Sequence, residues 1–230
     1  MKPILTVAFI FCTLVGAYQT SYSQQRYQRW GGGSDDQTLN FGFSFHYISA
    51  DYKIALEPDW QNAGYNSITS PFSRDLGLGL LASLKLGENT NLLFTPNLTF
   101  LNVDMEFEKD TETEVRTIHR SNIELPLLLK FKSDRKTNMR GYLIGGGQYA
   151  INVAPSKRYK PDEDIMTKPG YFAYTAGIGF DIYFDFFKMS PEIKWVQSVG
   201  NLLDRTEPNV FNGPIQRLML RSLQVSLIFE

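Results

Sequence analysis

The sequence has almost no cysteine and no excess charge of either sign. Its 230 residues include one cysteine, Cys12, and 23 Lys and Arg against 24 Asp and Glu. A single cysteine excludes a disulfide framework, and the balanced charge provides no basic surplus for nucleic-acid phosphates. We therefore expect no nucleic-acid partner.

Long hydrophobic runs are missing after residue 30. Because a transmembrane helix needs about 20 consecutive apolar residues, a polytopic helical membrane protein is excluded. A transmembrane β-barrel escapes this test, since its strands alternate lipid-facing apolar and lumen-facing polar residues.

The N-terminus carries the one apolar run. A short apolar core follows Lys2, and the chain turns polar before Ser23, which is the form of a secretory signal peptide. Cys12 would leave with this peptide, so the mature chain would have no thiol for catalysis or metal binding. We expect a signal peptide over residues 1–23, a flexible periplasmic leader over residues 24–37 and a barrel domain over residues 38–230.

Alternation of apolar and polar residues with a period of two recurs along the rest of the chain. This period indicates half-buried β-strands, and no long segment has helical spacing. The expected strands cover residues 39–47, 76–86, 92–100, 122–131, 140–153, 172–184, 189–195 and 222–229.

The expected connections differ in length at the two ends of the strands. The short ones cover residues 87–90, 133–138 and 185–187, and the long ones cover residues 49–74, 106–117, 154–168 and 200–214. Short periplasmic turns, long extracellular loops and an even strand number are typical of outer-membrane barrels. We predict an all-β fold, an eight-stranded antiparallel transmembrane β-barrel in the cell outer membrane. A soluble barrel with its apolar phase turned inward around a ligand is the alternative.

Aromatic residues near both strand ends favour contact with outer-membrane lipid, because aromatic belts mark membrane interfaces. We expect one belt at Tyr142, Tyr183, Phe184, Phe186 and Phe229, and another at Tyr47, Tyr149, Phe172, Tyr174 and Trp195. Arg217 and Arg221 share the outward phase near the loop end of the last strand, where they can reach anionic headgroups.

The inward phase carries charges of both signs, on Lys85, Glu124, Lys130, Asp181, Glu192 and Lys194. Side chains fill the interior of an eight-stranded barrel, and charges there must pair or stay hydrated. We predict a salt-bridged lumen network rather than a channel. A polar relay or a path for small solutes is the other interpretation.

Catalytic and cofactor signals are weak. His46 shares the inward phase with Ser44, and a Ser/His pair can serve acyl transfer. Residues two apart on any strand face the same way, however, and no flanking motif supplies an oxyanion hole. His119 borders a charged loop. We predict no enzymatic activity, no metal site and no cofactor.

The expected loops are rich in aromatic residues, namely Tyr52, Trp60, Tyr65 and Phe72 in the first and Tyr159 in the third. Exposed aromatics commonly anchor protein interfaces, which makes these residues candidates for partner contact. Alternatively, they pack on one another over the barrel mouth.

Several segments resemble a known family. Residues 122–131, Asn-Ile-Glu-Leu-Pro-Leu-Leu-Leu-Lys-Phe, resemble a strand of the small outer-membrane β-barrel family widespread in Bacteroidetes, as do the glycine-rich residues 141–147 and 177–181. Residues 191–195, Pro-Glu-Ile-Lys-Trp, with Gly-Asn-Leu at 200–202, resemble its PorT branch.

The PorT resemblance implies a component of the type IX protein secretion and gliding-motility machinery without enzymatic activity. Its partners would be other outer-membrane proteins of that system, and its role the export of cargo with C-terminal sorting domains. The alternative function is that of a general outer-membrane barrel with an adhesion, receptor or envelope-stabilising role.

Overall fold

The computed structural model describes residues 37–109, 112–153, 165–205 and 213–230, so the expected signal peptide and nearly all of the expected leader lie outside it. The described residues form ten strands and the short 3₁₀ helix η1 (Trp60–Ala63). None of their helices is long and apolar enough to cross a membrane. The strands are β1 (Leu39–Leu56), β2 (Ser67–Thr69), β3 (Asp75–Lys85), β4 (Thr90–Phe94), β5 (Asn97–Lys109), β6 (Glu112–Lys132), β7 (Met139–Asn152), β8 (Gly170–Tyr183), β9 (Lys188–Val199) and β10 (Ile215–Phe229).

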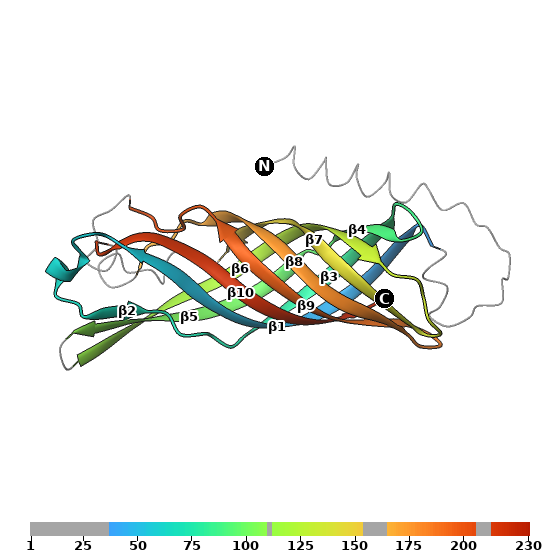
Figure 1. Ribbon diagram of the computed structural model, residues 1–230, viewed down its shortest axis with the longest axis horizontal. Coiled ribbons are helices and arrows are strands. Elements are labelled where there is room, and N and C mark those ends of the chain that lie inside the picture. The colour runs from blue at the N-terminus through green and yellow to red at the C-terminus, as the bar shows by residue number, and fades with distance from the viewer. Residues whose placement is uncertain (1–36, 110–111, 154–164, 206–212) are drawn as a thin grey trace.

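The strands close into an antiparallel barrel with eight positions around its wall (Figure 1). β1 pairs with β10 on one edge and with β3 on the other, which closes the ring. β4 and β5 share one position between β3 and β6, where Thr95 and Pro96 interrupt a single line of chain. β2 pairs with β5 beyond that ring. The expected eight-stranded fold is confirmed.

The outward face of the barrel wall is apolar over most of its height. Large exposed side chains occupy alternate positions on the long strands, as Phe41, Phe43 and Phe45 do on β1. We call this surface the apolar band; other members include Leu76, Leu78, Leu80, Leu98, Phe100, Ile123, Leu125, Leu127, Leu129, Phe172, Ile178, Phe180, Ile193, Leu223, Val225 and Leu227. The apolar phase therefore points outward, whereas the alternative of a soluble barrel requires it to point inward.

Polarity inverts where the strands continue beyond the apolar band toward the long connections. On β5, Val103 and Phe107 are fully buried inside, whereas Asn102, Asp104 and Glu106 face outward. The expected loop over residues 106–117 is wrong: residues 106–109 extend β5 and residues 112–117 extend β6, and the two strands stay paired in register to Lys109 and Glu112. Likewise β1 runs to Leu56, into the expected first loop.

One expected aromatic belt needs correction. Tyr142 and Tyr183 are buried in the lumen because they occupy the inward phase of β7 and β8. Phe184 and Phe186 are exposed at the short turn between β8 and β9, with 91 % of Phe186 accessible. The belt at the short-turn end thus consists of phenylalanines that project outward.

Two layers of side chains fill the lumen. The apolar layer lies toward the long connections and includes Ile48, Ala50, Tyr52, Tyr65, Ile68, Leu101, Val103, Met105, Phe107, Ile118, Ala150, Ile165, Tyr171, Ala173, Val196, Leu202, Leu203, Ile215, Leu218 and Leu220. The polar layer lies closer to the short turns and includes Ser44, His46, Asn97, Thr99, Glu124, Lys130, Gln148, Thr175, Asp181, Ser190, Glu192, Lys194, Gln224 and Ser226. A second, smaller apolar cluster forms around Leu81 and Leu128.

A glycine of β7 lets two strands approach closely. A Cβ atom on Gly146 would clash with the carbonyl oxygen of Leu127 and lie 2.9 Å from the Cα of Leu128, both backbone atoms of β6. At Gly147 the nearest atom would lie at an ordinary 3.8 Å.

We expect Gly146→Ala to lower the free energy of unfolding by about 1–3 kcal/mol, because backbone cannot move aside as a flexible side chain can. Gly147→Ala should stay within about 0.5 kcal/mol of the parent protein. Guanidinium titration in detergent micelles, followed by heat-modifiable gel migration, measures both. Equal effects of the two substitutions would contradict the close approach.

Candidate functional site

The polar layer contains a buried ion pair between β6 and β8. The Lys130 Nζ atom lies 2.7 Å from the Asp181 Oδ1 atom, and both side chains are almost inaccessible. The Ser190 hydroxyl of β9 donates to the same carboxylate at 2.6 Å. Because charges in a water-poor interior are costly unless paired, each group of this cluster depends on the others.

A tyrosine links this pair to a second group of charges. The Lys130 Nζ atom lies 3.7 Å from the centre of the Tyr142 ring, whose hydroxyl donates to the Glu192 carboxylate at 3.0 Å. Glu192 also pairs with Lys194 at 3.2 Å. Together with Asp181, these side chains form a continuous line across β6, β7, β8 and β9.

The two remaining lumen candidates are Glu124 and Lys85. Glu124 is buried and accepts a hydrogen bond from the Thr99 hydroxyl at 3.3 Å. Lys85 shares the inward phase but lies at the last position of β3, where it is half-buried rather than enclosed. Five of the six predicted lumen charges are thus buried in the barrel.

His46 lies among small polar side chains. Its Nε2 atom is 2.8 Å from the Ser44 hydroxyl and 3.2 Å from the Asn97 Oδ1 atom, and its Nδ1 atom is 2.7 Å from the Ser226 hydroxyl. Gly79 opens the space for this group, since a Cβ there would collide with the Asn97 and Ser44 side chains. The imidazole holds β1, β5 and β10 together.

The largest fully buried side chain of the described residues is Arg120, on the inward phase of β6. Its guanidinium donates to the Lys168 carbonyl at 3.2 Å from both Nη atoms and to the Thr167 hydroxyl at 2.8 Å. The charge also lies 5.4 Å from the centre of the Tyr171 ring. Arg120 therefore ties β6 to the chain that precedes β8.

Two segments cross the barrel mouth above Arg120. The Lys168 amide donates to the Leu202 carbonyl at 2.8 Å, and the Asp204 amide donates to the Met166 carbonyl at 2.9 Å. We call residues 165–168 and 201–205 the mouth segments. They insert Ile165, Leu202 and Leu203 into the apolar layer.

The loop aromatics divide between the two interpretations left open by the sequence. Tyr52 and Tyr65 are buried in the apolar layer, and Trp60 packs partly against it, so Tyr52 and Tyr65 are not available for partner contact. The reason is that β1 extends past residue 49 and carries Tyr52 on its inward phase. Phe72 is exposed. Tyr159 lies outside the described residues.

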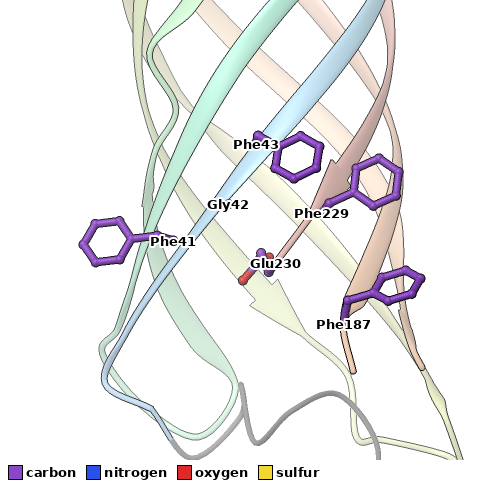
Figure 2. A pocket seen from close by; sticks show the side chains of 6 residues that line it. All are labelled: Phe41, Gly42, Phe43, Phe187, Phe229 and Glu230. Atoms are coloured by element: carbon purple, nitrogen blue, oxygen red, sulfur yellow. The ribbon is translucent and has the colours of Figure 1, made fainter. Parts of the chain in front are cut away.

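An open pocket of about 310 Å³ lies on the outer wall near the C-terminal residue (Figure 2). Figure 2 shows Phe41 on one side of Gly42 and Phe43, Phe187 and Phe229 on the other. The rings of Phe43 and Phe229 stack with centres 5.2 Å apart. This surface continues the apolar band, so its chemistry suits a hydrocarbon chain rather than a polar substrate.

Sequence reasoning missed Arg120 and the ion pair between Lys188 and Glu230, whose charged atoms lie 2.8 Å apart. Arg120 could have been found from the sequence, because it lies at alternate positions of the chain with Asn122 and Glu124 and therefore shares their inward phase. Metal ligation was not expected, and the described residues bring no group of three or more His, Cys, Asp or Glu side chains into a metal-binding arrangement.

Two solved structures are similar to this chain. The OprG outer membrane protein of Pseudomonas aeruginosa is similar at 13 % identity and a TM-score of 0.43, over 83 % of this chain and 91 % of that one. The N-terminal β-barrel domain of OprF from the same organism is similar at 10 % identity and a TM-score of 0.36, over 84 % and 98 %. None of the curated proteins matches the sequence. Residues 19–204 match the family model of the outer membrane protein beta-barrel domain, and the chain therefore belongs to this family of cell outer-membrane proteins.

Proposed function

We propose that this barrel is a non-enzymatic outer-membrane component of the type IX protein secretion system. In this role it supports export of cargo with C-terminal sorting domains, and gliding in organisms that glide. Its partners are other outer-membrane proteins of the system. The resemblance of residues 191–195 and 200–202 to the PorT branch supports this assignment within the family.

The filled lumen supports one part of the proposal, that the barrel acts through its surface. The interior is occupied in turn by the polar layer, the apolar layer and the mouth segments. A barrel of eight positions has no room for a protein chain beside its own side chains. Cargo therefore passes elsewhere, and this barrel acts through its surface. The hairpin of β5 and β6 beyond the apolar band offers a paired, exposed surface for protein contact.

Deletion of the gene should leave sorting-domain cargo in the periplasm, with export restored by the parent gene. A His46→Asn gene should restore export equally well, because we assign the imidazole a structural role. Fractionation and immunoblotting of cargo measure both. Normal export in the deletion strain would contradict the proposal and favour the general adhesion, receptor or envelope role; failure of His46→Asn in a folded barrel would contradict the non-enzymatic assignment.

Photo-crosslinking in intact cells tests the contact surface. Val115 and Leu127 share the outward phase of β6 and are 51 % and 53 % exposed, but Val115 lies on the hairpin and Leu127 within the apolar band. A benzophenone side chain at Val115 should crosslink to another outer-membrane component of the secretion system, whereas the same group at Leu127 should not. Crosslinking of neither position to such a component would contradict contact through the hairpin.

A further inference from the structure

Basic side chains gather on the outward face of β1 and β10 just beyond the apolar band. Lys53 and Arg217 are exposed there, and Arg221 is half-buried. Lys53 lies opposite Met219 in the antiparallel register, so Arg217 and Arg221, which flank Met219 on the same face, are its diagonal neighbours. Diagonal neighbours on one face of a sheet are about 7–8 Å apart, within reach of one ligand for long side chains.

The chain that leads into β3 adds a fourth cation beside β1. Arg74 is exposed and directly precedes Asp75, which lies opposite Ile48. Nearby, Phe72 is 66 % exposed, and its ring centre lies 5.8 Å from the guanidinium carbon of Arg221. We call Lys53, Arg74, Arg217 and Arg221 the basic outer patch.

One carboxylate belongs to the patch, and it is already engaged. Asp51 is buried and accepts hydrogen bonds from Arg221, with 2.6 Å between Nε and Oδ1. Within the described part of the chain, Lys53, Arg74 and Arg217 have no acidic partner. The patch therefore keeps an excess of positive charge, and Asp51 orients the Arg221 side chain.

The depth of the patch on the barrel identifies its surroundings. Arg221 is the next outward residue after Leu223, which lies opposite Trp195 of β9. Trp195 packs edge-on against Tyr174 at 5.5 Å between ring centres, and both are more than two-fifths exposed. Exposed Trp and Tyr mark the level of the headgroups. Because the long connections are extracellular in such barrels, the patch lies in the outer leaflet.

We propose that the basic outer patch binds the phosphate groups of the glycolipid in the outer leaflet, a lipid of the lipid A class. Charge complementarity supports this occupant: exposed cations at headgroup depth face a leaflet whose lipids carry phosphate, and guanidinium groups match phosphate oxygens in geometry. Phe72 and Met219 supply apolar contact beside the cations, at the level where the lipid passes from sugar to acyl chain.

Binding of diphosphoryl lipid A to the purified barrel in detergent micelles tests this assignment. We expect Lys53→Ala with Arg217→Ala to weaken binding about thirtyfold, or roughly fivefold for each cation removed at an anionic surface. The matched control removes two exposed cations elsewhere, Lys109→Ala with Lys136→Ala, and should change affinity less than twofold. Microscale thermophoresis gives the affinities, and heat-modifiable gel migration verifies folding.

Lipid A stripped of its phosphates separates headgroup recognition from acyl-chain contact. It should bind the parent barrel at least as weakly as the patch variant binds the phosphorylated lipid, because the variant keeps two of the four cations. Equal affinity for the two lipids, or equal weakening by the patch and control variants, would overturn the proposal. If the alanine pair does not fold, Lys53→Gln with Arg217→Gln provides the same comparison with less change in side-chain volume.

Discussion

Asp181→Ala should destabilise the barrel by about 3–5 kcal/mol. The substitution leaves the Lys130 ammonium buried without its carboxylate, which lies 2.7 Å away in the parent protein, and it removes the acceptor of the Ser190 hydroxyl. Breaking a buried pair by removing one partner costs this much because the remaining charge is uncompensated. Guanidinium titration in micelles, monitored by heat-modifiable migration, measures the loss.

A double substitution distinguishes the stranded charge from lost packing. Lys130→Met combined with Asp181→Asn removes both charges at nearly constant side-chain volume and keeps an acceptor for the Ser190 hydroxyl, and should recover most of the lost stability. Asp185→Ala, in the exposed turn after β8, serves as the surface control and should change stability by less than about 0.5 kcal/mol. A double variant no more stable than Asp181→Ala would show that the pair itself is not the source of the effect.

Arg120→Met should cost about 2–4 kcal/mol and loosen the mouth segments. Methionine retains much of the side-chain volume but cannot donate to the Lys168 carbonyl or the Thr167 hydroxyl, so each of these part-buried acceptors loses its donor. Because these acceptors belong to one mouth segment, hydrogen exchange should accelerate at the amides of Lys168 and Asp204. Mass spectrometry of exchanged peptides gives this second measurement.

The control for Arg120 is an arginine that makes no buried contact. Arg217→Met replaces an exposed side chain on β10, and should leave both the stability and the exchange of the mouth segments within error. If Arg120→Met lowers stability without changing exchange at residues 165–168, the arginine stabilises β6 alone and does not hold the mouth segments.

The sequence predicted the part of the fold that lies in lipid and missed the part that lies in water. Outward residues of β6 from Ile123 to Phe131 are apolar, so their alternation with polar lumen residues is plain. Above Ile123 the outward residues include His119 and Ser121, and the contrast between the two faces disappears. The strand continues, and Arg120 remains on its inward phase, but the alternation of apolar and polar residues stops where the strand leaves the lipid.

The members of the lumen network followed from phase, whereas their pairing did not. Lys130 and Asp181 belong to strands separated by β7 and lie 51 positions apart in the sequence. Which charge meets which depends on the register and tilt of three strands, and alternation gives neither. Tyr142 was misplaced for a related reason, since its position near a strand end suggested an interface while its phase directs it inward.

The inversion of polarity along β5 and β6 fixes how deeply the barrel can sit in its bilayer. A shift by one pair of residues, about 7 Å along a strand, would carry Asn102 and His119 into hydrocarbon or draw the apolar side chains at the opposite end into water. The wall therefore has one vertical position of lowest free energy. In a thicker or thinner bilayer, the lipid around the barrel must stretch or compress to match it, while the protein keeps its place.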